Sequence, residues 1–383
     1  MTRSTPAAFV LSCVMTLVLA APASAQLSGI LGKAKKAEDA AKKVADLNIS
    51  EQDERKIGED VSRRLRDTFG VYQDAEVTKY VAIVGTVLAQ ASSRPNLNWT
   101  FIVLDTDGVN AFAAPGGIVH VTRGLLGLMQ NEAQLAGVLG HEITHVTAKH
   151  TVHAIQKSKV VSLGAEQSRT GTLTSEIVSR IAEQAYHMVL ENQFDRGDEM
   201  ESDKVGVRLA NQVGYAPSGL VEALTLLSDR NKGSDAPNGL FASHPDTKAR
   251  IDALTKLIAQ EKLHATATVA ARYKEHITFE AKPVTDIATV APGSRGLAGG
   301  GSSAAEKTDG KEEKPAEPKK KGGLLGKFGL SSGQQAQSSQ TVASAGGRAI
   351  GPDTLATGGA NKNAVQVTIT PAELETFRKG IAG

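Results

Sequence analysis

The chain has 383 residues, with 43 lysines and arginines against 41 aspartates and glutamates, so its formal charge is only +2. Binding to a nucleic-acid backbone needs a concentrated basic surface, and base stacking needs aromatic side chains, which make up only 4% of this sequence. Composition therefore argues against a nucleic-acid partner and is typical of one or two globular domains.

The N-terminus has the pattern of a cleavable export signal. Arg3 precedes an apolar run over residues 7–21, and the small residues 23–25 offer a cleavage site before Gln26. We therefore predict a signal peptide over residues 1–25 and export to the periplasm. The alternative is an uncleaved membrane anchor, but the run is shorter than the ~20 residues that span a bilayer. The single cysteine, Cys13, lies inside this run, so we expect a mature chain without disulfides.

A folded domain is predicted to follow a charged helix or linker at residues 26–50. Ser50 begins a capping pattern, and apolar periodicity then predicts helix after helix with few strands between them. The fold class we expect is therefore α+β and mainly helical. The expected helices lie over about 51–69, 75–91, 131–155, 175–193, 196–212, 218–229 and from about 246, and the expected strands over 99–104 and 117–122.

The C-terminal part changes character twice. Residues 266–290 have the composition of short strands, and residues 291–363 have almost no large apolar side chains, which predicts a disordered low-complexity linker. The last segment, 364–383, predicts a small strand and a helix capped by Thr370. The Gly/Leu/Lys stretches at 29–36 and 319–332 resemble one another; we favour linkers over peripheral membrane association for both.

The sequence His141-Glu142-Ile143-Thr144-His145 is an H-E-x-x-H motif within one of the predicted helices. Residues four apart on an α-helix lie about 40° apart around the axis, so both imidazoles can reach one Zn²⁺ ion. Zinc lowers the pKa of a bound water molecule, and Glu142 can accept its proton as general base. The motif therefore predicts one catalytic zinc per chain, with a third protein ligand elsewhere.

The candidates for that third ligand lie on the predicted helix after residue 195. This stretch is rich in carboxylates, and spacing alone does not choose among Glu199, Glu201 and Asp203. Without the upstream motif, the same pattern would be read as a solvated acidic face.

Four stretches together resemble the HtpX/BepA/Oma-type family of zinc metallopeptidases, the periplasmic BepA-like branch in particular. They cover about residues 51–258, and the ordered set is more specific than H-E-x-x-H alone. Two small departures from the family pattern are Ser202, where alanine is usual, and Asp195, where serine is usual. The stretches are 110–117 followed by 121–126, 135–142, 196–203, and 243–245 with Arg250 and Ile251.

The resemblance implies a gluzincin-type domain over residues 51–265 and roles for three residues. Glu199 would be the third zinc ligand beside His141 and His145. Asp203 would be a second carboxylate that donates a proton or orients a ligand. His244, in a loop before Pro245, would approach the zinc and either inhibit or assist the reaction.

Other residues near the motif are given lesser roles. Residues 110–122 are expected to form an edge strand beside the cleft, where an extended substrate can pair with the backbone. His150, His153 and His187 are expected to be surface or supporting histidines rather than ligands.

The function predicted is a zinc-dependent endopeptidase that hydrolyses misfolded or misassembled cell-envelope proteins. The hydrolase chemistry is predicted from the motif, whereas the substrate class is implied by the resemblance alone. The alternatives are a periplasmic chaperone or assembly factor with a latent protease site and a zinc-stabilised scaffold. Glu142 argues against the scaffold, because a structural site has no use for a base there. The oligomeric state is left open.

Overall fold

The computed structural model describes residues 49–158, 173–191, 194–232, 247–290 and 351–382. Within these ranges it is mainly helical around a three-stranded sheet, which confirms the predicted fold class. The signal peptide, residues 26–48 and most of the low-complexity linker lie outside the described residues, so the predictions for them stay predictions. None of the described helices has the length and apolar character that crossing a bilayer requires.

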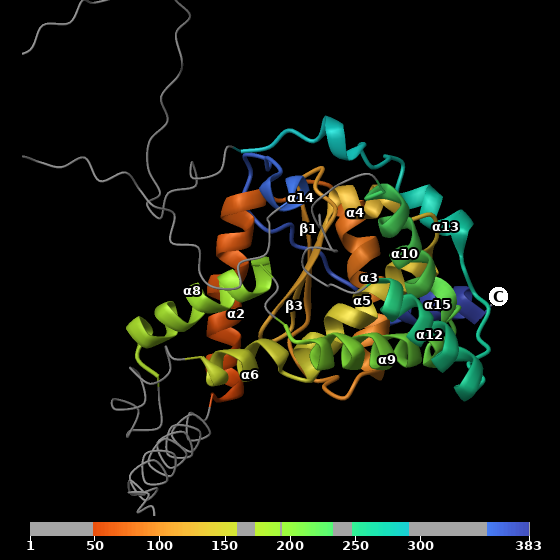
Figure 1. Ribbon diagram of the computed structural model, residues 1–383, viewed down its shortest axis with the longest axis horizontal. Coiled ribbons are helices and arrows are strands. Elements are labelled where there is room, and N and C mark those ends of the chain that lie inside the picture. The colour runs from red at the N-terminus through yellow and green to blue at the C-terminus, as the bar shows by residue number, and fades with distance from the viewer. Residues whose placement is uncertain (1–48, 159–172, 192–193, 233–246, 291–350, 383) are drawn as a thin grey trace, which may run out of the picture.

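The sheet has the order β1-β3-β2, with β1 (Thr100–Leu104) parallel to β3 (Ile118–Thr122) and β2 (Ala111–Ala114) antiparallel to it. Both faces are covered, by α2 (Glu51–Phe69) on one side and by α3 (Ala75–Ala91) and α5 (Glu132–Thr147) on the other (Figure 1). Because successive strand residues face opposite sides, Phe101 and Val103 join the core under α3 and α5. Ile102 and Leu104 join the core under α2.

The segment predicted as one edge strand, residues 110–122, is a hairpin. Gly116 and Gly117 have φ angles of 73° and 95°, a conformation that suits glycine, and they turn the chain back on itself. As a result β3 is the middle strand and only β2 lies at the edge. The strand predicted over 117–122 is confirmed as β3, whereas residues 111–114, expected to share one edge strand with it, form the separate strand β2.

The predicted helix over 131–155 is two helices. Asn131 caps α5 as expected, since its side chain accepts a hydrogen bond from the Gln134 amide at 3.0 Å. Lys149 then has a left-handed conformation (φ 57°, ψ 34°), and α6 runs in a new direction over His150–Lys157. Apolar periodicity does not reveal a break made by one residue. The Lys149 ammonium reaches the buried carboxylate of Glu54 at 3.3 Å.

Four helices complete the part of the domain around α5. They are α8 (Ser175–Glu191), α9 (Arg196–Gln212), α10 (Ser218–Arg230) and α12 (Thr247–Glu261), close to the predicted bounds. In the described part of the chain α5 packs most extensively against α9 and α10. A short helix that the sequence analysis missed, α4 (Arg123–Leu128), follows β3.

The prediction of short strands over 266–290 was wrong. This stretch forms α13 (Ala270–His276) and a 3₁₀ turn (Val284–Asp286), and its pairing with other segments is limited to isolated bridges. The sequence pattern suits strands, but among the described residues this stretch makes only isolated bridges. The helix instead buries Tyr273, whose hydroxyl donates to the Leu126 carbonyl at 2.6 Å.

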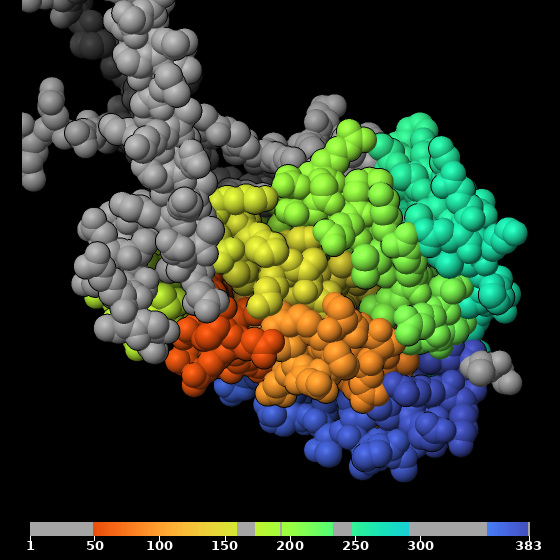
Figure 2. All heavy atoms as spheres, turned by 90° about the horizontal axis from the view of Figure 1, so that it is seen from below, coloured from red at the N-terminus to blue at the C-terminus, as the bar shows by residue number. Residues whose placement is uncertain are grey.

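The C-terminal residues pack on the domain rather than extending from it. Residues 351–363 were predicted to belong to a disordered linker, yet Asp353, in α14 (Pro352–Leu355), is buried and ion-paired with Arg230 at 2.7 Å. No strand forms at 364–369, but α15 (Pro371–Ala382) is present and has the predicted cap at Thr370. The blue C-terminal residues lie against the orange residues of α3 in Figure 2.

Candidate metal centre

The three residues of the H-E-x-x-H motif that carry its chemistry lie on α5 and are buried. His141, Glu142 and His145 have exposed fractions of only 1–2%. The Nε2 atoms of His141 and His145 lie 3.1 Å apart, so the two imidazoles converge on one point as the helical spacing predicts.

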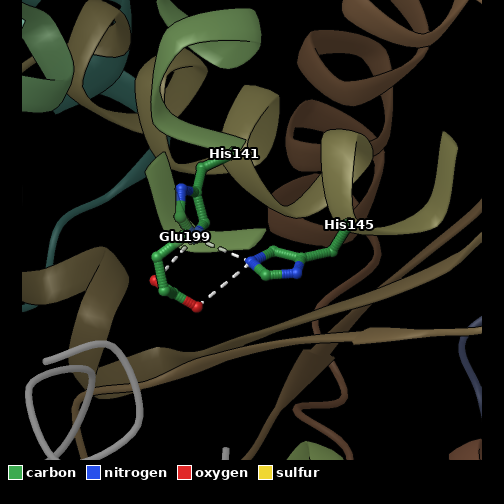
Figure 3. A group of neighbouring side chains, drawn as sticks. All are labelled: His141, His145 and Glu199. Atoms are coloured by element: carbon green, nitrogen blue, oxygen red, sulfur yellow. Dashed lines mark hydrogen bonds and ion pairs between the residues drawn. The ribbon is translucent and has the colours of Figure 1, made fainter. Parts of the chain in front are cut away.

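Helix α9 brings the third candidate ligand to this point. The two helices approach closely where Gly140 meets Gly206, and a Cβ on Gly206 would lie 2.7 Å from the backbone nitrogen of His141. Glu199 lies two turns before Gly206, and its carboxylate oxygens face both imidazoles (Figure 3). They lie 3.7 Å from His141 Nε2 and 3.6 Å from His145 Nε2.

These three side chains suit a zinc ion by donor type and by spacing. One ligand atom from each lies within 4.8 Å of the others, and all three residues are buried. Tetrahedral zinc with bonds of about 2.0–2.2 Å places its ligand atoms roughly 3.3 Å apart. Two imidazoles and one carboxylate are also a donor set typical of catalytic zinc, which keeps a fourth position open. The identity of the metal stays a prediction.

Asp203 contacts the other nitrogen of His141. Its Oδ1 lies 2.9 Å from His141 Nδ1, on the same face of α9 as Glu199. Burial would raise the pKa of Asp203, but the ion pair with Arg250 and the hydrogen bond with His141 outweigh it and hold this pKa well below its usual range. An ionised carboxylate here accepts the Nδ1 proton and so fixes the tautomer that leaves Nε2 for a metal. Of the two roles expected for Asp203, the geometry favours orientation of a ligand over proton donation.

Arg250 is the site residue to which the sequence analysis gave no role. It extends from α12, is 2% exposed, and its Nε and Nη2 atoms donate to the two oxygens of Asp203, each at 2.7 Å. Its Nη1 also lies 3.5 Å from Glu199. The sequence could have pointed to Arg250 through the match of Arg250 and Ile251 to a family motif. Spacing along the chain does not connect residues 203 and 250.

Glu142 is buried, and burial alters its proton affinity. Burial is the main cause that raises the pKa of Glu142 to about 7, and the negative charge of Glu199 contributes. His141 and Arg250 act in the opposite direction. A general base works best when its pKa lies near the working pH.

The remaining candidates lie in different surroundings. His153 and His187 are exposed, as expected. Glu201 points toward His150 rather than toward the two converging imidazoles, with Oε2 at 3.4 Å from His150 Nε2. His244 lies outside the described residues, and its role stays a prediction.

The edge strand lies close to the three converging side chains. Ala113 and Ala114 of β2 line the same small pocket as His145. Helix α8 also packs against β2. The structure thus places the sheet edge beside the site, whereas pairing with a substrate stays a proposal.

Comparison with known proteins agrees with the resemblance to zinc metallopeptidases found in the sequence. Residues 75–258 match the model of peptidase family M48. The beta-barrel assembly-enhancing protease of Yersinia pestis is 26% identical over 234 residues, which cover 58% of this chain and 48% of that protein. The protein of that name from Escherichia coli K12 is 27% identical over 217 residues (54% and 44%). The mitochondrial metalloendopeptidase OMA1 of Arabidopsis thaliana is 29% identical over 188 residues (48% and 36%). The chain thus spans about half the length of the first two.

Proposed function

We propose, from the premise that residues 75–258 are a peptidase family M48 domain, that this protein is a zinc-dependent endopeptidase. The observation that carries the proposal is the convergence of His141, His145 and Glu199 on one buried point. The adjacent Glu142 supplies a base. All four side chains come from two helices that are fixed against each other at Gly140 and Gly206.

The chemistry divides between the metal and the side chains around it. When bound, zinc supplies a Lewis acid that polarises a carbonyl oxygen and makes water more acidic. Glu142 accepts a proton from the water molecule that attacks the peptide carbonyl, and can return it to the leaving amine. Asp203 accepts the Nδ1 proton of His141, and Arg250 keeps Asp203 ionised throughout.

The substrates we propose are misfolded or misassembled proteins of the cell envelope, cleaved in the periplasm. Three observations support this class. Strand β2 lies at the sheet edge next to His145, where backbone pairing would bind extended segments of many sequences. Two of the relatives are named for enhancing beta-barrel assembly, and the N-terminal sequence has the pattern of an export signal.

Glu142→Gln tests the proposal. The amide is close in shape to the carboxylate but cannot accept a proton, so we expect the cleavage rate of an unfolded protein to fall by about two to four orders of magnitude. Zinc content and melting temperature should stay at the parent values. Glu375→Gln is the control, because it removes a carboxylate of α15 that is 61% exposed, and it should cleave at nearly the parent rate.

The same two proteins distinguish the endopeptidase from the alternative function, a chaperone with a latent protease site. A chaperone with a latent protease site would suppress aggregation of the unfolded protein equally well in the parent and in the Glu142→Gln variant, and the parent would show no chelator-sensitive cleavage. Near-full cleavage by the Glu142→Gln variant would contradict the proposed mechanism. Failure of the zinc-loaded parent to cleave any unfolded protein would contradict the endopeptidase itself.

A further inference from the structure

His145 has a second ring nitrogen that the proposed function does not use. Its Nε2 atom faces His141 and Glu199, so its Nδ1 atom points away from them (Figure 3). The Nδ1 atom of His150 lies 3.1 Å from that nitrogen. The two rings meet edge to face with centroids 4.9 Å apart, and both residues are at most 2% exposed.

The left-handed residue Lys149 is what brings His150 to this place. In an unbroken helix, residue 150 would lie about 140° around the axis from residue 145 and would point elsewhere. The break starts α6 at His150 and turns its ring back toward His145. Phe194 packs against His145, with ring centroids 4.4 Å apart.

The proton positions in this pair follow from the chemistry of imidazole. A neutral His145 that binds a metal through Nε2 carries its single proton on Nδ1. That proton can only be donated, and Nδ1 of His150, 3.1 Å away, is placed to accept it. His150 then carries its own proton on Nε2, which faces Glu201 Oε2 at 3.4 Å and Asp198 Oδ1 at 3.7 Å.

Each of the two candidate metal-binding histidines therefore has a buried acceptor for its Nδ1 proton. For His141 the acceptor is Asp203, a carboxylate, at 2.9 Å. For His145 it is a second imidazole, which in turn faces the carboxylates at the start of α9. Acceptors of this kind set the tautomer and the ring orientation of a metal ligand.

We propose that His150 is a positioning residue for His145 and thereby for the metal that the proposed function requires. It accepts the Nδ1 proton of His145 and holds the His145 ring so that Nε2 faces His141 and Glu199. The buried Ser202 hydroxyl also lies 3.3 Å from His150 Nδ1. In the metallopeptidase family that this sequence resembles, alanine is usual at position 202. We infer that the contact of the Ser202 hydroxyl is particular to this chain.

The test compares two substitutions of His150 in the full chain. His150→Leu keeps an apolar side chain of similar size without an acceptor, whereas His150→Asn places a carbonyl oxygen near the original Nδ1 position. We measure zinc affinity by competition with a chromophoric chelator, and the melting temperature of the zinc-free protein. His153→Leu, on the exposed face of α6, is the matched control.

We expect His150→Leu to bind zinc about 10- to 100-fold more weakly, the range that loss of such a partner produces. His150→Asn should recover most of that loss, and His153→Leu should bind zinc like the parent. If His150→Leu does not fold, His150→Ala serves in its place with the same expected loss.

Two results would overturn the inference: parent-like zinc affinity in His150→Leu, or an equal loss in His150→Leu and His150→Asn. If only the melting temperature of the zinc-free protein falls, His150 is a packing residue and not a positioning one. A parent chain that binds no zinc would contradict the proposed function, and this inference with it.

Discussion

The two ends of helix α5 each hold a buried carboxylate, and the two carboxylates have opposite surroundings. At the N-terminal end Glu132 is fully buried and accepts hydrogen bonds from Tyr80 at 2.8 Å, from Tyr215 at 2.5 Å and from Arg272 at 2.7 Å. Toward the C-terminal end, Glu142 lies beside two imidazoles and Glu199. Its buried position raises the pKa of Glu142 to about 7.

The comparison shows that a buried carboxylate can serve either the fold or the chemistry of a site, depending on its neighbours. Glu132 has a guanidinium and two hydroxyl donors, which offset the cost of removing its charge from water. It connects α3, α13 and the start of α5. The motif residues have converging imidazole nitrogens and a carboxylate whose pKa is raised by burial. We infer that the first end of α5 maintains the fold and the second carries out chemistry.

Glu132→Ala should produce a large loss of stability, because it leaves the half-buried guanidinium of Arg272 and the buried hydroxyls of Tyr80 and Tyr215 without their partner. We expect the free energy of unfolding to fall by about 3–5 kcal/mol, as for other broken buried ion pairs. Denaturant titration of the zinc-free protein measures this. Glu375→Ala, which removes an exposed carboxylate of α15 near Lys379, should change it by less than about 0.5 kcal/mol. Equal effects of the two substitutions would remove the structural role of Glu132.

Asp203→Asn should weaken metal binding, and it also removes the charge that pairs with the buried Arg250. The amide can rotate and offer an N–H group to His141, so the Nδ1 tautomer is no longer fixed. We expect zinc affinity to fall by about 10- to 100-fold. Chelator competition measures it, and parent-like affinity in this variant would show that Asp203 does not orient His141.

His120 extends the comparison to a buried histidine outside the site. It lies in β3, and its Nε2 is 2.9 Å from the Ser62 hydroxyl of α2. Burial is the main cause that lowers the pKa of His120 to about 3. In the unfolded chain its pKa is about 6.5, so between these two values only the unfolded state binds the proton. The stabilising contribution is therefore complete above about pH 6.5 and is lost as the pH falls toward 3.

The expected slope for His120 is at most about 1.4 kcal/mol per pH unit between pH 6 and 4. Unfolding free energies of the zinc-free parent and of His120→Gln, measured over this range, isolate it, because glutamine does not titrate. The parent should lose stability more steeply with acid than the variant. Identical slopes would mean that His120 is not kept neutral by burial.

Local patterns predicted the helix of the site but not all of its partners. Asn131 and the apolar spacing located α5, and the motif identified His141, Glu142 and His145. For the acidic stretch on α9, helical spacing left three carboxylates open, because each of them contacts a different partner. Glu199 faces both imidazoles, Asp203 faces only His141, and Glu201 faces His150.

Contacts between distant segments were not predictable from spacing. Arg250 follows Asp203 by 47 residues, and a guanidinium shows its partner only once two helices are packed. Lys149, at the bend, pairs with Glu54, which is 95 positions earlier in the chain. The buried Asp353 was missed because the segment around it lacks large apolar residues, whereas an ion pair with Arg230 holds it.

The central claim is that His141, His145 and Glu199 bind one zinc ion, and zinc stoichiometry of matched variants tests it most directly. Metal analysis after equilibration with zinc and removal of the excess should give about one ion per parent chain and per Glu201→Ala chain. Glu199→Ala should retain almost none, since a three-ligand site loses its only carboxylate ligand. Full zinc in Glu199→Ala, or loss of zinc in Glu201→Ala instead, would contradict the account.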